Sequence, residues 1–575
     1  MLQIGSGKLY QNGVGRENLL RGVIYSNLSI FGEHKIETVA GSILPTSYLN
    51  NSLSLVYEFS EFMEKQEIAP SVIVSHGIEP YISDFSAILS FALNCVATPD
   101  NNLANRLLGE QRGLSTPAPP KKIVSRFFDN QIVFKPDDEK YLCDFIKQLI
   151  GLERRCFLGV MRAIRTYITG MLRIGDDLEL AYTLIVASIE SLAQDFDGHK
   201  ANWDDFDQRR RKKIDTALND AEEDVKKKVR TAILEIEHTA LSRRFRSFSI
   251  EHVNSSFFRE EAVGIASPIA KSDLPSVLNQ AYKARSKYVH NLRELPRNLK
   301  FGNLSCETLR IDKVTWLTLQ GLSRLARHVI IEFINKQPTV DSESYDYHLE
   351  RTGIIQAPLA PQYWIGNVHN ITRECGPKRL EGFLQQLTPF LFLKPDYQIT
   401  DLTPVLEVVE SMLPQFKKCE RLPFIALYLL FNGFLPEEQK MKGVKEFENK
   451  YGNEITQPSS EALIYILLFD LKVEWELSIH KDTIDNYFNS RDNKLSFRLP
   501  RALEAGILLN LAERYRLDGQ FDEAKKYVEL SLENMPENKQ LSEFESNYKF
   551  HCKDVITWSE IIFPKSEDKE QVEDA

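Results

Sequence analysis

Residues 177–192 decide the fold at the centre of this chain, and they read DLELAYTLIVASIESL. A helix over this stretch is apolar around most of its circumference, from Ala181 to Leu192. Such a helix is stable when other helices bury it, so the stretch predicts the core helix of a helical bundle. One acidic residue interrupts the apolar run. Glu190 is expected either to pair with a core Arg such as Arg165 or to serve a functional site.

The flanking sequence supplies further helices for this bundle. Residues 137 to about 172 predict a long helix, with two Asp residues placed to cap its start. Residues 314–334 have the apolar spacing of a long amphipathic helix. We therefore expect residues 137–336 to form one helical bundle of domain size.

The rest of the chain divides by composition. Stretches at 20–30 and 35–44 carry apolar and β-branched residues between Gly, Asn and Pro, as the strands of a small sheet do. The expected fold class is mainly α, with a strand-rich region before the bundle and a helical region after it. The predicted parts are a mixed α/β domain (1–98), a linker or mobile loop (99–136), the bundle (137–336), a connector (337–378), a helical repeat-like domain (379–565) and a disordered acidic tail (566–575).

A repeat signature lies near the end of the chain. Small and aromatic residues there fall at the spacing of a 34-residue helix-turn-helix unit. Over about 505–538 the sequence resembles one tetratricopeptide repeat, and the resemblance implies a surface that binds peptides or protein segments. A protein trigger or partner is therefore expected for this region. The residues that carry the signature are Leu508, Leu511, Ala512, Tyr515, Gly519, Phe521, Ala524 and Pro536.

Charge argues against a protein that coats nucleic acid indiscriminately. The net charge of the 575 residues is −10, which opposes general attraction to a polyanion. Residues 201–300 differ, because they hold 20 Lys and Arg against 15 Asp and Glu. Within them, the basic runs at 209–213 and 226–228 are more typical of a solvated helix face than of an RNA track.

Other classes of protein find little support. No apolar run approaches the roughly 20 residues that a membrane span requires, and the first residues lack the layout of a secretory signal, so a cytoplasmic location is expected. The seven cysteines are scattered and no two form a Cys-x-x-Cys pair. We therefore expect no zinc site, no disulfide framework, no other metal and no cofactor.

The chemistry-bearing stretch is 281–291, which reads AYKARSKYVHN. It places Arg285 five positions before His290 in a sequence that otherwise predicts helix. An Arg neutralises a phosphate through a rigid fork of donors, and a His takes and returns a proton near neutral pH. These two groups are the minimum for cutting RNA without a metal. A second Arg/His pair with similar spacing, Arg246 and His252, is what chance supplies in a chain of this length.

Context makes the first pair the more specific of the two. The chain presents the Ile-Glu-Ser-Leu element at 189–192, a basic helical stretch, Tyr282-x-x-Arg285-Ser286-x-x-x-His290 and then the helix at 314–334. This order resembles the HEPN superfamily of helical RNases, in its Apea-like branch, over about 137–336. The resemblance covers roughly a third of the chain.

The resemblance implies a role for each matching residue. Arg285 matches the Arg that contacts the scissile phosphate, and His290 matches the catalytic His. Ser286 occupies the polar position after the Arg, and Glu190 matches an acid that orients the Arg or the His. Proteins of this kind act as dimers, and similar proteins serve in anti-phage defence. The chain departs from the pattern after the His, where Asn291 replaces a common Gly.

Two residues between Arg285 and His290 are RNA-binding candidates. Lys287 is expected to hold a phosphate, and Tyr288 either contacts RNA or packs in the core. At about 100° per residue, Arg285 and His290 lie about 140° apart around a helix. They are therefore expected to meet one substrate at a helix end or across a symmetric interface.

The Arg285/His290 pair together with the resemblance implies a metal-independent endoribonuclease, a homodimer with an RNA substrate, regulated as an effector of anti-phage defence. The alternative is a non-catalytic dimeric scaffold or sensor, which binds a protein partner through its C-terminal repeats. An Arg285 and a His290 that face one shared, solvent-accessible groove lined by basic side chains favour the nuclease. A His290 buried against apolar neighbours favours the scaffold.

Overall fold

The computed structural model forms two compact units, Met1–Ile355 and Gln356–Ala575. The chain is mainly helical with an antiparallel five-stranded sheet near its N-terminus, which confirms the predicted fold class. Among the residues that the structure describes, no helix is both long and apolar enough to cross a membrane. The description covers all residues except 11–12, 32–33, 50–51, 65–74, 110–117, 197, 199–202, 204–207, 237–240, 302–305, 348–349, 351–358, 370, 393–397, 549–552 and 564–575.

The sheet of the first unit is built on a long antiparallel pair, β1 (Gly15–Ser26) and β5 (Ser52–Glu64), in a register that places Val23 opposite Val56. Its strand order is β3-β4-β5-β1-β6. Helix α2 (Glu79–Leu93) packs on one face through stacked rings, with Tyr57 and Phe85 at 4.4 Å. The remaining strands are β3 (Ile36–Thr38), β4 (Gly41–Leu49) and β6 (Ala97–Thr98), and the short parallel pair β2 (Leu28–Ser29) and β7 (Ile132–Val133) lies beside them.

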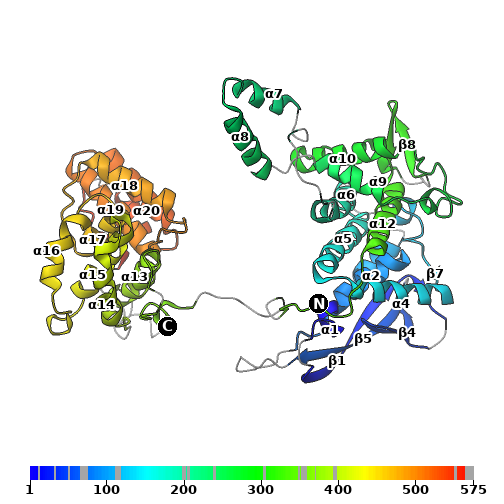
Figure 1. The fold of residues 1–575 in the computed structure, drawn as a ribbon, viewed down its shortest axis with the longest axis horizontal. Helices are drawn as coiled ribbons and strands as arrows, with labels where there is room; N and C mark the ends of the chain where they lie inside the picture. Colours follow the sequence, from blue (N-terminus) through cyan, green and yellow to red (C-terminus); the bar gives the residue numbers. More distant parts are fainter. Residues whose placement is uncertain are drawn as a thin grey trace. The chain divides into compact units, whose positions relative to one another are not determined.

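The predicted core helix is α6 (Leu178–Phe196), and most of its residues are buried. It packs against α5, α9, α10 and α12 (Figure 1). One continuous core joins these helices to the sheet, so the predicted ranges 1–98 and 137–336 lie in the same unit. The other elements of this unit are α1 (Leu2–Gly5), α3 (Asn101–Leu108), α4 (Pro136–Gly151), α5 (Arg154–Arg173), α7 (Gln208–Ala217), α8 (Glu223–Ile236), α9 (Leu241–Glu251), α10 (Leu274–Asn291), α11 (Arg297–Lys300), β8 (Thr308–Ile311), β9 (Val314–Leu317) and α12 (Leu319–Lys336).

Two helices differ from the sequence-based prediction. The helix predicted over 137–172 is two helices, α4 and α5, because the chain turns extended at Leu152. The Gln3 amide, far away in sequence, donates to the carbonyls of Ile150 and Leu152 and satisfies the broken end. The helix predicted over 314–334 begins only at Leu319, because Val314–Leu317 pairs with β8 as strand β9. The Thr318 hydroxyl caps the helix by accepting from the Gly321 N–H.

Segments expected to be loops are partly packed into the first unit. The range 99–136, expected to be a linker or mobile loop, contains α3 and the fully buried Phe127 and Phe128. Asn101, Asn102 and Asn105, which suggested a loop, lie in α3, and the Asn27 amide donates to the Phe127 carbonyl. The first part of the predicted connector 337–378 also packs, with Tyr347 fully buried and its hydroxyl donating to Glu64.

The second unit is helical in its described part. Helices α19 (Arg501–Leu517) and α20 (Phe521–Asn534) pack together as a hairpin, and the turn between them uses Gly519 at φ +78°. The helix-turn-helix expected over 505–538 is present, and its assignment as a tetratricopeptide repeat stays a prediction. The predicted acidic tail 566–575 lies outside the described residues. The other helices are α13 (Gly376–Phe392), α14 (Thr403–Met412), α15 (Lys418–Gly433), α16 (Val444–Ile455), α17 (Ser460–Leu468), α18 (Leu477–Ser490), α21 (Lys539–Tyr548) and α22 (Trp558–Ile562).

Candidate functional site

Helix α10 carries the candidate catalytic and RNA-binding residues between 285 and 290. It packs against α6, α9 and β9. Its buried face consists of Leu274, Val277, Leu278, Ala281 and Ala284. Lys283, Lys287 and His290 are exposed. The helix contains three always-charged cations and no Asp or Glu between Leu274 and Asn291. Its exposed face is therefore positive along its second half.

Glu190 of α6 meets Arg285 of α10. An Arg285 Nη2 lies 2.9 Å from a Glu190 Oε2, and their side chains are 23% and 4% exposed. The Tyr282 hydroxyl donates to Glu190 at 3.2 Å, and the Gln194 amide donates at 3.4 Å. Arg165 instead pairs with Asp84. The structure thus pairs Glu190 with Arg285, and the expected pair with Arg165 is not formed.

Tyr282 is a neutral donor in this cluster at neutral pH. Burial and the negative charge of Glu190 raise the pKa of Tyr282 to about 12. The Arg285 guanidinium lies 5.9 Å from the centre of the Tyr282 ring, and the Arg285 Nε is buried with no hydrogen-bond partner among the described residues. Part of the donor fork of Arg285 is thus left over after the ion pair with Glu190 forms.

The last turn of α10 is fastened to the start of α6. The Tyr288 hydroxyl donates to Asp177 at 3.2 Å, and burial together with Asp177 raises the pKa of Tyr288. After the helix, the Leu295 N–H donates to Glu179 at 3.2 Å, and Lys300 pairs with the same carboxylate. The structure places Tyr288 as an anchor of α10, and its expected contact with RNA stays a prediction.

His290 lies exposed in the last turn of α10. The helix ends with Leu292 in the left-handed conformation at φ +50°, and the Leu292 N–H donates to the Tyr288 carbonyl. Asn291, which stands where the resembled family often has Gly, is still helical. Leu292 is 74% exposed and Val289 is exposed beside it. Apolar surface therefore adjoins His290.

Within one chain, Arg285 and His290 do not converge. Helix α10 is regular between them, so the two side chains project about 140° apart. Arg285 faces α6, whereas His290 faces away from the packed side. Ser286 is half-buried and lies between them around the helix. His290 is accessible, but within one chain Arg285 and His290 do not face the shared groove that the nuclease interpretation expects. The separation requires that a site using both residues be completed across an interface or at the helix end.

In the second Arg/His pair, the His lies in the core. His252 is buried, and its Nδ1 lies 2.9 Å from the Phe248 carbonyl. Burial lowers the pKa of His252. Its ring packs 5.6 Å from Phe333. His252 is thus unsuited to exchange protons with a substrate, and Arg246 serves as a control position.

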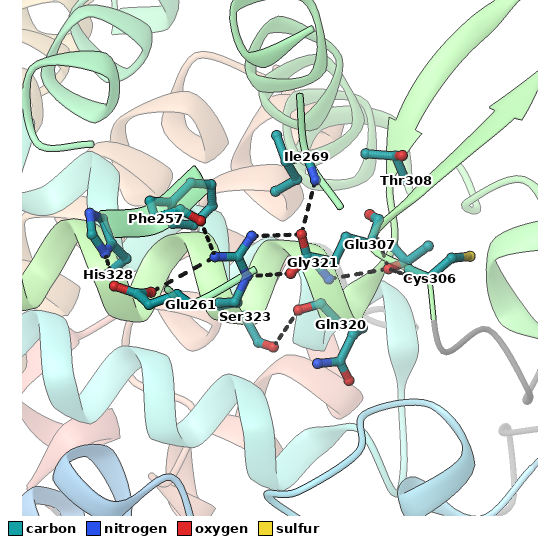
Figure 2. Close-up of polar contacts among 12 residues, drawn as sticks. Phe257, Glu261, Ile269, Cys306, Glu307, Thr308, Gln320, Gly321, Ser323 and His328 are labelled. Carbon is teal, nitrogen blue, oxygen red and sulfur yellow. Dashed lines mark hydrogen bonds and ion pairs between the residues drawn. The ribbon is translucent and has the colours of Figure 1, made fainter. Parts of the chain in front are cut away.

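A buried polar network, which the sequence did not predict, holds the segment that leads into α10 (Figure 2). Arg324 of α12 donates Nε and Nη2 to the fully buried Glu307, and its Nη1 donates to the Phe257 carbonyl at 2.9 Å. The Glu307 carboxylate also accepts from the Ile269 N–H at 3.0 Å. Because Ile269 lies five residues before α10, the network fixes where that helix begins.

Neighbours extend this network along α12. The Nδ1 of His328 lies 2.8 Å from a Glu261 carboxylate oxygen, and both residues are drawn in Figure 2. Within the described ranges, no group of three or more His, Cys, Asp or Glu side chains is placed to hold a metal ion. The network is an arrangement of ion pairs and hydrogen bonds that joins segments far apart in sequence.

Comparison of the chain with protein families, curated proteins and solved structures finds no match.

Proposed function

We propose that this chain is a metal-independent endoribonuclease that acts as a homodimer, with Arg285 and His290 as its catalytic residues. The observation that carries the proposal is the α6–α10 pairing. It holds Arg285 on a buried carboxylate while His290 stays exposed at the end of the same helix. A helix with no carboxylate of its own favours a polyanionic substrate.

The chemistry needs only these side chains and the RNA. His290 takes the proton of a ribose 2′-hydroxyl, and the oxygen attacks the adjacent phosphorus. The bond from phosphorus to the 5′-oxygen breaks, and that oxygen receives a proton from the imidazolium. Arg285 stabilises the negative charge that builds on the phosphoryl oxygens. The products are a 2′,3′-cyclic phosphate, which water opens to a 3′-phosphate, and a 5′-hydroxyl.

A homodimer could bring Arg285 and His290 to one substrate despite the angle of about 140° between them on α10. Arg285 of one protomer and His290 of its partner reach one phosphate if the two helices cross near their C-terminal ends. The exposed Val289 and Leu292 at that end supply apolar surface for such a crossing. In this arrangement Glu190 orients Arg285, Ser286 lines the space beside it, and Lys287 contacts a phosphate.

Regulation and location belong to the same proposal. A nuclease that cuts cellular RNA has to stay idle until needed, and an effector in anti-phage defence fits that requirement by analogy with similar proteins. The helical second unit is the proposed sensor of a protein trigger. The cytoplasm, where the RNA substrates lie, is the proposed compartment.

The test compares RNA cleavage by the full chain, Arg285→Ala, His290→Ala and Arg246→Ala, each with and without chelator. The proposal expects cleavage by the full chain and by Arg246→Ala, and none by the other two variants. Circular dichroism checks that each variant folds. Cleavage that survives His290→Ala, or that stops when chelator is added, would overturn the proposal.

A second candidate function is a non-catalytic dimeric scaffold. Arg285 lies on the packed side of α10, where its ion pair with Glu190 also serves as a structural tie. The second unit has a cavity of about 900 Å³ lined by Phe390, Ile399, Phe431 and Phe434 together with polar residues such as Asp401. The scaffold predicts that the full chain and all three variants dimerise equally and leave RNA uncut, with or without phage challenge.

A further inference from the structure

The exposed face of α10 carries a line of three cationic or titratable side chains, Lys283, Lys287 and His290, here called the basic stripe. At 100° per residue, Lys283 and His290 differ by about 20° around the helix, and Lys287 lies about 40° from Lys283. The stripe runs for about 10 Å along the axis, at a rise of 1.5 Å per residue. All three side chains therefore face solvent along one edge of the candidate site.

The charges of the stripe are not neutralised locally. In the described part of the chain, no carboxylate lies within ion-pair distance of Lys283 or Lys287. The nearest acid in sequence after the stripe, Glu294, pairs with Lys300 instead. Since α10 itself has no acid, both lysines keep their full attraction for an external anion.

The other basic segments of the first unit differ in this respect. On α8, Lys226 pairs with Glu223 and Lys228 pairs with Asp224. Arg230 of α8 pairs with Asp215 of α7. Much of the positive charge of these segments is neutralised by ion pairs with nearby carboxylates. They are therefore weaker candidates for binding a polyanion than the stripe on α10.

We propose that the basic stripe binds the phosphates of single-stranded RNA on one side of the scissile phosphate, with His290 at the scissile end and Lys283 farthest from it. This inference rests on the proposed function. A stacked strand rises about 3.4 Å per nucleotide, so the stripe spans roughly three nucleotides of one strand. Duplex RNA is bound across about 16 base pairs and two minor grooves, a much larger surface than this line of side chains.

The inference adds a binding residue and a substrate length to the proposed reaction. Lys283 acts as a second phosphate contact beside Lys287. Since neither lysine reaches the reacting atoms, their loss weakens substrate binding while the chemical step continues. We therefore expect Lys283→Gln and Lys287→Gln to raise KM about fivefold each at 0.1 M salt, because a single-strand phosphate contact scales as salt to the power of about −0.7. The kcat of each variant stays that of the full chain.

Binding measured apart from cleavage tests this inference. Fluorescence anisotropy follows a 2′-O-methyl RNA of ten nucleotides, which lacks the attacking hydroxyl, across a series of salt concentrations. The slope of log K against log salt should fall in magnitude by about 0.7 for each lysine removed. Lys140→Gln, which removes an exposed lysine from α4, should keep the slope of the full chain.

The outcomes separate this inference from the proposed function. Unchanged slopes in Lys283→Gln and Lys287→Gln overturn the proposal that the basic stripe binds RNA phosphates, even if the full chain cleaves RNA through His290. Slopes reduced by both lysines support the stripe as an RNA-binding surface even if no RNA is cut, and in that case only the nuclease proposal fails. Binding of duplex RNA with the same lysine-dependent slope and higher affinity would contradict the single-stranded assignment.

Discussion

The Arg285 guanidinium and the Glu190 carboxylate lie 2.9 Å apart across the contact between α10 and α6, with Glu190 almost wholly buried. This ion pair joins α6, which was predicted from its apolar pattern, to α10, which carries the candidate catalytic residues. It also fixes which side of α10 faces the bundle. The orientation of every candidate residue on α10 follows from it.

The two partners of this pair should contribute unequally to stability. Arg285→Ala leaves a buried carboxylate without its cation, and we expect a loss of about 3 kcal/mol in the free energy of unfolding. Glu190→Gln keeps a hydrogen-bonding group and frees an Arg that reaches solvent, so about 1 kcal/mol is expected. Urea unfolding of both variants measures the difference. The double variant should cost less than the sum, and strict additivity would contradict a direct coupling.

Glycine substitutions at two neighbouring positions at the end of α10 should change the stability of the first unit in opposite directions. Leu292→Gly relieves a left-handed residue that costs a side chain about 1–2 kcal/mol, so the first unit should gain about 1 kcal/mol. Asn291→Gly places Gly in a regular helical turn and should lose about 0.5–1 kcal/mol. Thermal unfolding compares the two. Equal effects would mean that the helix does not end where the structure places it.

The same Leu292→Gly variant tests the proposed interface. Removing an exposed apolar side chain beside His290 should weaken homodimerisation while stabilising the protomer. Sedimentation at several concentrations measures the dimer. A variant that dimerises as tightly as the full chain would show that this end of α10 does not form the interface.

The network between α12 and Glu307 leaves no room at Gly321. A Cβ added there would lie 2.4 Å from the Glu307 carbonyl oxygen, so Gly321→Ala should destabilise the first unit by about 1–3 kcal/mol. The matched control is Gly452→Ala on α16, where no described heavy atom lies within 4 Å of the new Cβ. That change should stabilise its helix by about 0.5–1 kcal/mol. Chemical unfolding of both variants checks the contrast.

A buried His should make the second unit sensitive to acid. His480 is 1% exposed, and burial lowers its pKa to about 3. The folded state therefore stays unprotonated at this residue between about pH 6.5 and 3, whereas the unfolded state binds a proton. Stability present above pH 6.5 is lost as the pH falls, by about 2 kcal/mol at pH 5.

Urea unfolding at pH 7 and pH 5 measures this loss. His480→Leu should remove about 2 kcal/mol of the difference between the two pH values, whatever its effect on stability at pH 7. His369→Gln changes an exposed residue of the same unit and should leave the difference intact. If His480→Leu and the full chain lose equal stability, another group carries the acid sensitivity.

Much of the fold was predictable because its signals are local. The apolar circumference of 177–192 predicted the buried α6, and its observed bounds, Leu178–Phe196, agree closely. The break at Leu152 was not predictable, since its carbonyl is satisfied by Gln3 from the start of the chain. The strand β9 was missed because the apolar residues before Leu319 fit a helical period as well as a strand.

The candidate site was predictable in part for the same reason. The motif Arg-x4-His pointed to Arg285, and the core helix pointed to Glu190. The fold brings these two side chains into contact. Lys283 was missed, although its spacing of seven residues from His290 places both on one helix face. The bond from Tyr288 to Asp177 depends on tertiary packing, and no local pattern could assign it.

The central claim is that one active site takes Arg285 and His290 from two copies of this chain. The most direct measurement mixes purified Arg285→Ala with His290→Ala under conditions that exchange subunits and follows cleavage of a labelled RNA. Each variant alone should be inactive, and the mixture should recover about a quarter of the full chain's activity, because half of the dimers then carry one intact site. Cleavage by the full chain with no recovery in the mixture would contradict the account.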